Sequence, residues 1–233
     1  MKFDLTDICG TKHEMDTENW GERFINIDCM DALKAMPDKC VDLCIVDPPY
    51  GIGIGINPVR QMHEKKNWDS AVPNEAYFNE LVRVSQHQII WGGNYYNLPA
   101  TQNIIVWDKL QPHDFSLAMC EFAWCSIQKP AKMFRYSVLT ERNKIHPTQK
   151  PIALYKWLLS NYAKPGDKIL DTHVGSASSL IACHQMGFEY WGFELDTDYF
   201  NAATERLNRV KAQVDIFDVA ELPKIEQVGE WNG

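Results

Sequence analysis

Residues 41–50 read VDLCIVDPPY, an apolar run that ends in an acid, two prolines and a tyrosine. The run from Val41 to Val46 predicts a buried strand. Prolines have no backbone N–H and hold φ at about −65°, so the carbonyls after this strand are expected to lie outside a regular ladder. With the Asp47 carboxylate and the Tyr50 ring, they form a group of acceptors that suits a bound amine. An ordinary turn is the alternative interpretation.

The composition indicates one α/β domain. The chain has 233 residues, of which 45% are hydrophobic and 12% aromatic, enough for one sizeable core. No apolar run comes near the length of about 20 residues that a membrane span needs, and the N-terminus has no signal-peptide pattern. The seven cysteines form no CxxC pair, which favours free thiols in the cytoplasm. The seven histidines have no metal-ligand spacing, so no metal is expected.

The net charge of −8 argues against a generic nucleic-acid binder. Basic side chains nevertheless gather in two segments close to the motifs, one after residue 50 and one leading up to residue 150. They predict contact with a phosphate backbone along one face, while a solvated basic loop is the alternative for either segment. The residues concerned are Arg60, Lys65, Lys66, Lys129, Lys132, Arg135, Arg142 and Lys144.

Strands and helices are expected to alternate through most of the chain. Seven strands are predicted, at residues 24–28, 41–46, 88–91, 103–107, 121–127, 167–171 and 190–194. Helices are expected at residues 29–36, 73–85, 151–162, 178–186 and 197–210. This alternation predicts a doubly wound, mostly parallel sheet with helices on both faces. Residues 1–22 are expected to form a loose polar arm.

Polar residues or glycine stand at the ends of five predicted strands. They are Asp28, Asp47, Gly92, Asp171 and Glu194. Ligands of parallel α/β sheets bind beyond the C-terminal ends of the strands, so these five positions mark the expected site.

Residues 168–179 read KILDTHVGSASS, which predicts a strand, a turn of small residues and a helix start. Such a turn lets backbone approach a ligand, and the helix N-terminus offers free N–H groups. Glu194 ends the next predicted strand, where an acid can accept hydrogen bonds from both hydroxyls of a ribose. Ala177 stands two residues after Gly175, where a G-x-G turn would have its second glycine. An ordinary helix N-cap is therefore the alternative.

Residues 146–151 read HPTQKP and precede a predicted helix. The Thr148 hydroxyl, the Gln149 amide and the Lys150 ammonium suit a carboxylate ligand there. A capped helix start is again the alternative.

The joint order of DPPY, HPTQKP, the small-residue turn and the acid-ended strand resembles the β-class amino-methyltransferases of DNA, over residues 24–210. Those enzymes move a methyl group from S-adenosylmethionine to the exocyclic amine of adenine or cytosine. The resemblance implies a seven-stranded Rossmann-like sheet with one antiparallel strand in a single domain, residues 1–233. It places the catalytic strands and target loop at about 24–127, a basic loop at 128–146 and the cofactor part at 146–210. No separate target-recognition domain is expected. A second subunit of a homodimer is one way to complete the recognition of the DNA sequence.

The resemblance also implies roles for individual residues. The catalytic set is Asp47, Pro48, Pro49 and Tyr50, in which Asp47 and the Pro48 carbonyl accept the two N–H groups of a flipped base and Tyr50 stacks on it. On the cofactor, Asp28 meets the adenine amine, Glu194 the ribose and Asp171 the methionine amine. Thr148 and Lys150 meet the methionine carboxylate. Asp47, His173, Gly175 and Ser176 complete the expected cofactor contacts.

Two departures from the family pattern bear on these expectations. His173 stands where the family usually has phenylalanine, and Ala177 where it has glycine. In the resembled class an aspartate at the first position of the tetrapeptide is typical of adenine enzymes, so the resemblance implies that Asp47 acts on adenine N6, with double-stranded DNA as the expected partner. Cytosine N4, adenine in RNA and a non-catalytic DNA-binding homologue remain alternatives. Trp91, Trp107 and Trp124 are expected to be core residues rather than base stackers.

Overall fold

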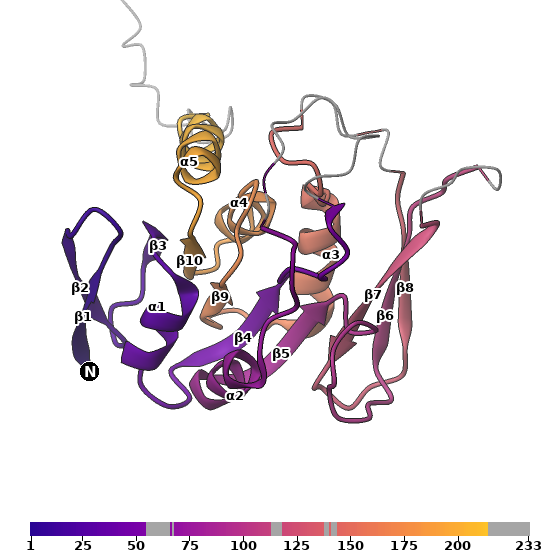
Figure 1. Ribbon diagram of the computed structural model, residues 1–233, viewed down its shortest axis with the longest axis horizontal. Coiled ribbons are helices and arrows are strands. Elements are labelled where there is room, and N and C mark those ends of the chain that lie inside the picture. Colours follow the sequence, from indigo (N-terminus) through magenta and orange to yellow (C-terminus); the bar gives the residue numbers. More distant parts are fainter. Residues whose placement is uncertain (55–65, 67, 113–117, 138–139, 141–143, 214–233) are drawn as a thin grey trace, which may run out of the picture.

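The computed structural model describes residues 1–54, 66, 68–112, 118–137, 140 and 144–213 (Figure 1). Within them, eight strands form one sheet in the order β3-β10-β9-β4-β5-β7-β6-β8. Only β7 runs antiparallel to its neighbours among these strands. The strands are β3 (Glu22–Asn26), β4 (Val41–Val46), β5 (Ser85–Trp91), β6 (Ile104–Asp108), β7 (Cys120–Cys125), β8 (Lys132–Arg135), β9 (Ile169–Asp171) and β10 (Tyr190–Glu194).

Helices cover both faces of this sheet. One face packs against α3 (Ile152–Tyr162), α4 (Ser178–Gln185) and α5 (Thr197–Lys211). The other packs against α1 (Cys29–Ala35), α2 (Glu75–Val84) and a hairpin of β1 (Lys2–Thr6) and β2 (Lys12–Asp16). Figure 1 shows this hairpin beside β3 at one end of the sheet and β6–β8 at the other. The predicted doubly wound, mostly parallel sheet with an antiparallel strand is confirmed.

Two expectations about the fold are corrected. In the described part of the chain the sheet has eight strands rather than seven, because β8 lies inside the segment expected to be a basic loop. β8 is a short edge strand with three exposed side chains, so its apolar pattern is weak. Residues 1–22 are not a loose arm: the β1–β2 hairpin buries Leu5 and Met15 to 2% and 1% exposure.

Helix starts place the polar loops at the C-terminal edge of the sheet. The Asp28 carboxylate accepts a hydrogen bond from the Met30 N–H at the start of α1. The Asp196 carboxylate does the same for the second and third residues of α5. Such caps satisfy N–H groups that have no partner inside the helix. Each cap lies two residues beyond the end of a strand, β3 or β10, so each helix begins where a ligand of the sheet can reach it.

Gly92, which follows β5, is required by the packing of the strand ends. Its φ is +73°, and a Cβ there would lie 2.3 Å from the Tyr50 ring. The Tyr50 ring, in the loop after β4, therefore packs directly against the backbone of Gly92 in the loop after β5. This close approach holds the tyrosine of the DPPY segment against β5.

Candidate active site

A cavity of about 500 Å³ opens at the C-terminal edge of the sheet. Its wall brings together residues from all three predicted motifs, as expected for strand ends of a parallel sheet. The predicted residues that line it are Asp28, Asp47, Pro49, Thr148, Lys150, His173, Gly175, Ser176 and Glu194. Pro48, Tyr50 and Asp171 are not part of the lining.

The DPPY segment leaves β4 as expected. Its Pro48 and Pro49 carbonyls accept from the Tyr96 hydroxyl at 2.8 and 3.1 Å, in place of a neighbouring strand. The Asp47 carboxylate accepts from the Tyr50 hydroxyl at 2.6 Å and from the Lys150 ammonium. Acceptors thus converge at the strand exit, and each already has a protein donor.

The Lys150 ammonium lies between two acids. Besides Asp47 it contacts Glu121 at 3.0 Å, and Glu121 also contacts Lys109 at 2.6 Å. Burial raises the pKa of Asp47, although Lys150 opposes that shift. Burial also acts to raise the pKa of Glu121, but Lys150 and Lys109 outweigh it and lower that pKa to about 2. Lys150 was expected to bind a cofactor carboxylate, whereas here protein carboxylates hold it.

Sequence reasoning missed Glu121 and Lys109. Both lie outside the motifs, and neither has a local pattern that distinguishes it from a surface charge. β6 and β7 pair so that Trp107 lies opposite Glu121, and the Lys109 N–H bonds to the Met119 carbonyl at 3.0 Å. Only the pairing of these strands brings the two charges to the end of β4.

The acids at the other end of the cavity are held by backbone N–H groups. Glu194 accepts from Gly175 at 2.8 Å and from Asp196 at 2.9 Å. Burial raises the pKa of Glu194. Asp28 lies on the same wall, and its carboxylate accepts from Met30 at 2.7 Å. Two fixed acids on one wall can receive the hydroxyl and amine donors of a nucleoside.

Asp171 is 2% exposed, and its carboxylate accepts from the Ser179 hydroxyl at 2.5 Å and the His173 N–H at 3.0 Å. Burial raises the pKa of this carboxyl to about 7. Its neighbours Thr172 and His173 form the cavity wall instead. Burial lowers the pKa of His173 to about 4, so the ring is neutral at pH 7 and can pack like the aromatic residue it replaces.

Ala177 has the left-handed conformation, with φ 60°, at the cap of α4. This conformation costs a residue with a Cβ about 1–2 kcal/mol, which explains why a glycine suits the position. The Ala177 methyl is fully buried in the core. It therefore fills the core rather than the cavity, whose wall has Gly175 and Ser176 at this turn.

The histidine and threonine of the HPTQKP segment line the cavity together with Gln149 and Lys150. His146 is 9% exposed, and its ring lies 4.3 Å from that of Tyr199 and 5.2 Å from that of Trp68. The Thr148 hydroxyl lies 3.0 Å from His146 Nδ1, on the cavity wall. These contacts fix the segment between the cavity and α3.

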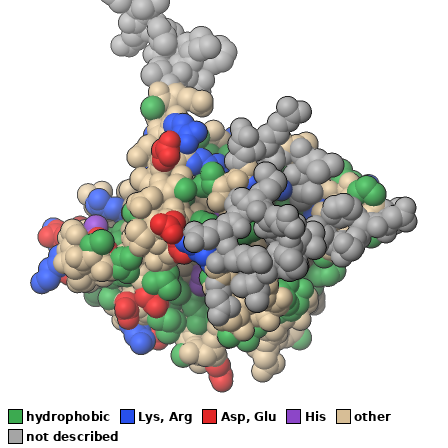
Figure 2. Space-filling view, turned by 45° about the horizontal axis from the view of Figure 1, so that its top comes forward, with side chains coloured by type: hydrophobic (Ala, Val, Ile, Leu, Met, Phe, Trp, Pro, Cys, Tyr) green, Lys and Arg blue, Asp and Glu red, His purple; other side chains and the backbone are tan. Residues whose placement is uncertain are grey.

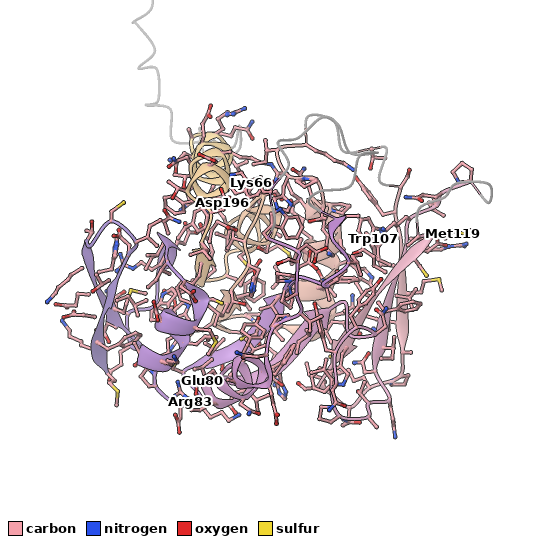
Figure 3. All side chains as sticks on the ribbon, in the orientation of Figure 1. Lys66, Glu80, Arg83, Trp107, Met119 and Asp196 are labelled. Atoms are coloured by element: carbon pink, nitrogen blue, oxygen red, sulfur yellow. The ribbon has the colours of Figure 1, made fainter. Side chains whose placement is uncertain are left out.

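The basic residues expected to bind DNA are placed differently from one another. Lys66 contacts Asp196 at 2.7 Å and Asp198 at 2.6 Å, and Figure 3 shows Lys66 beside Asp196. Lys129 and Lys132 bond to Asn161, which lies near the C-terminal end of α3. Lys150 precedes the N-terminal end of the same helix, so these two lysines lie away from the cavity.

Arg135, with an exposed side chain, pairs with Asp108 at 3.0 Å at the end of β8. Lys144 is half-buried. Figure 2 shows acidic and basic side chains interspersed on the face it presents. Arg60, Lys65 and Arg142 lie outside the described residues.

The aromatic residues also separate into two kinds. Trp91 and Trp107 are core residues, at 0% and 2% exposure. Trp124 is half-buried, and its indole N–H donates to the Pro99 carbonyl at 2.7 Å. Tyr50 stacks on Tyr95 with ring centroids 5.0 Å apart, so a base that stacks on Tyr50 must share or displace that contact.

In residues 1–54, 66, 68–112, 118–137, 140 and 144–213, no group of three or more histidines, cysteines and acids is arranged to hold a metal ion. In the same ranges, no helix has the length and apolarity needed to cross a membrane.

Comparison with known proteins gives consistent relatives. A family model described as DNA methylase (N6/N4) matches residues 90–205. YubD of Escherichia coli (strain K12), named as a methylase, is 26% identical over 214 residues, which cover 81% of this chain and 91% of YubD. The type II methyltransferase M.HinfI of Haemophilus influenzae is 24% identical over 250 residues, covering 79% of this chain and 67% of that protein.

Solved structures share the fold. The M1.HpyAVI–SAM complex has a TM-score of 0.57 at 20% identity, covering 79% of this chain and 98% of that chain. The PvuII DNA methyltransferase, described as cytosine-N4-specific, has a TM-score of 0.55 at 13% identity, covering 82% of this chain and 91% of that chain. At these identities the likeness concerns the fold alone.

Proposed function

We propose that this chain, an S-adenosylmethionine-dependent DNA amino-methyltransferase related to the N6/N4 methylases, methylates the exocyclic N6 amine of adenine in double-stranded DNA. The observation that carries the proposal is the position of Asp47, at the exit of β4 and on the wall of the cavity. Next to it, the Pro48 carbonyl accepts from a side chain instead of a strand.

The chemistry follows from these acceptors. The lone pair of an aromatic amine is delocalised into its ring, which makes the nitrogen a poor nucleophile. Hydrogen bonds from both N–H groups to Asp47 and the Pro48 carbonyl favour the form in which the lone pair is localised and aimed at the methyl donor. The Pro48 carbonyl oxygen has two lone pairs, so it can accept the amine beside the Tyr96 hydroxyl, whereas Asp47 has to weaken its bond to Lys150 in order to accept the amine. A bond would form between the nitrogen and the methyl group as the methyl–sulfur bond of the donor breaks, and the nitrogen would then give up one proton, for which we assign the Asp47 carboxylate as the acceptor.

The cavity fits the methyl donor. Its volume of about 500 Å³ lies within the usual range of about 300–1,000 Å³ for small-ligand sites. We assign Glu194 to the ribose and Asp28 to the adenine amine, because both acids lie on the wall with their positions fixed by backbone N–H groups. His173, Gly175, Ser176 and Thr148 line the remainder. When bound, S-adenosylmethionine would supply a methyl group on a positively charged sulfur. This methyl group is already electrophilic, so no protein base is needed to activate it.

The DNA-facing part of the proposal rests on fewer residues than the sequence suggested. A base must leave the duplex to reach Asp47, at a cost of a few kcal/mol. Arg135 and Lys144 are proposed to contact phosphates, together with Arg60, Lys65 and Arg142 outside the described residues. We further propose that the chain acts as a single methyltransferase domain, without a separate target-recognition domain.

Cytosine N4 is the second candidate, because the matched family covers both amines. The aspartate at position 47 supports adenine as the target base, because an aspartate at this position is typical of the adenine enzymes in the resembled class. The test is transfer of labelled methyl groups to DNA of mixed sequence, followed by digestion and nucleoside mass spectrometry. N6-methyladenine is the expected product. N4-methylcytosine would select the second candidate, and the absence of both products would contradict both.

A further inference from the structure

Four charged side chains, defined here as the charge cluster, meet beside the tetrapeptide: Asp47, Glu121, Lys109 and Lys150. Lys150 contacts both acids, and Glu121 also contacts Lys109. Their side chains are 15%, 22%, 10% and 3% exposed, in the order given. Two acids and two ammonium groups balance one another, as a group so far from water requires.

The cluster connects the end of β4 with β7 and β6, which lie beyond β5 in the sheet. Asp47 follows β4, Lys150 precedes α3, Glu121 lies in β7 and Lys109 follows β6. The Tyr50 hydroxyl lies among them, at 3.2 Å from Lys150 Nζ and 3.4 Å from a Glu121 oxygen. Glu121 is therefore close to the reacting group without lining the cavity.

If Asp47 accepts a hydrogen bond from a base amine, its ion pair with Lys150 becomes weaker. The Lys150 side chain is only 3% exposed, so water cannot solvate its ammonium group well. An unpaired buried charge is strongly destabilising. Glu121 offers a second anion to the same ammonium at 3.0 Å. Lys109, at 2.6 Å, keeps that anion in place.

We propose that Glu121 is a positioning residue that retains the Lys150 ammonium while Asp47 engages the target amine. The inference rests on the proposed function, which gives Asp47 its amine. Without Glu121, Lys150 depends on Asp47 alone, and the carboxylate stays bound to the lysine rather than to the base. Turnover then falls although the cofactor site is unchanged.

The pH dependence of turnover gives a second readout. The titratable and charged groups that face Asp47 are Lys150, Glu121, Tyr50, Tyr96, Tyr155 and Asp171. Burial raises the pKa of Asp47 most, Lys150 opposes it, and the Glu121 charge raises it further. A neutral residue at 121 therefore moves the acid limb of the turnover profile to lower pH.

The experiment compares Glu121→Gln, Lys109→Met and the double variant with the wild type. Glu80→Gln is the matched control, because Glu80 forms an ion pair with Arg83 on α2 at 2.7 Å. Figure 3 shows this pair in the lower part of the view, away from Trp107 of β6. Turnover is measured across pH, with KM for DNA and calorimetric binding of S-adenosylhomocysteine. The double variant restores the charge balance of the cluster, so it separates the loss of Glu121 from misfolding.

We expect Glu121→Gln to lower turnover by about tenfold or more and to shift its acid limb to lower pH, with KM and S-adenosylhomocysteine affinity within about threefold of wild type. Lys109→Met keeps Glu121 and should lose less than about threefold. The double variant should stay as slow as Glu121→Gln, and Glu80→Gln should match the wild type.

Wild-type turnover in Glu121→Gln would overturn the inference. So would a parallel loss of S-adenosylhomocysteine affinity, an unshifted acid limb, or recovery of turnover in the double variant. Each of these results leaves the proposed function standing. Failure of the function itself is seen separately, as absence of methyl transfer by the wild type.

Discussion

Asp47 accepts hydrogen bonds from protein donors on both of its carboxylate oxygens. Tyr50 holds one oxygen, and Lys150 holds the other while also contacting Glu121. This arrangement orients the carboxylate at the exit of β4 and keeps its charge in a buried place. In the proposed reaction, binding of an amine to Asp47 would weaken its bond to Lys150, and Glu121 would position that lysine during the exchange.

His173 is the residue whose titration has the clearest consequence for stability. Its pKa in the folded chain is about 4, because burial disfavours the imidazolium, whereas a histidine in an unfolded chain titrates near the ordinary value of about 6.5. Below that ordinary value the unfolded chain gains a proton that the folded chain does not. The free energy of unfolding should therefore fall as the pH drops from about 6.5 towards 4.

The His173→Phe variant should lose this part of the acid sensitivity. At about pH 5 the histidine is expected to cost the wild type about 2 kcal/mol relative to neutral pH. Urea unfolding of both proteins at the two pH values measures the difference. Equal acid sensitivity in wild type and variant would show that His173 is protonated in the folded chain.

At the scale of elements, the contact between the loops after β4 and β5 positions the tetrapeptide. Gly92 has φ +73° and leaves no room for a Cβ beside the Tyr50 ring. Gly92→Ala should destabilise the fold by about 2 kcal/mol or more, from backbone strain and displacement of the ring, and should lower turnover by displacing Tyr50 from Asp47. Gly187→Ala, also at positive φ but with open space around its Cβ, is the control for strain alone. Thermal unfolding and turnover are compared, and equal effects of the two variants would contradict the steric argument.

Sequence reasoning located the elements whose signal is local. β4 and β10 have the predicted bounds, because an apolar run ends at an acid in each. The motif residues that line the cavity follow from the rule that ligands bind at the C-terminal ends of parallel strands. β8 was missed because three of its four residues are exposed at the sheet edge. The charge cluster could not be predicted, because Glu121 reaches Lys150 only through the pairing of β7 with β5 and β6.

At the scale of the whole molecule, the acidic chain must meet DNA through a limited set of cations. Lys129 and Lys132 bond to Asn161 near the end of α3, whereas Arg135 ends β8 at the same edge of the sheet as Asp108. Arg135→Ser should therefore weaken DNA binding and reduce the slope of log affinity against log salt by about 1. Lys132→Ser, in the same strand, is the matched control and should change neither. A larger effect of Lys132→Ser in salt titrations would reverse the assigned DNA-facing side.

The central claim, that Asp47 grips the amine and leaves the methyl donor to other residues, is tested most directly by Asp47→Ala. Methyl transfer to DNA and calorimetric binding of S-adenosylhomocysteine are measured on the same preparation. Asp38→Ala, which removes an exposed partner of Arg83, serves as the control. We expect transfer to fall by about 100-fold or more, with S-adenosylhomocysteine affinity close to that of the wild type. Transfer at the wild-type rate, or equal loss of transfer and binding, would contradict the claim.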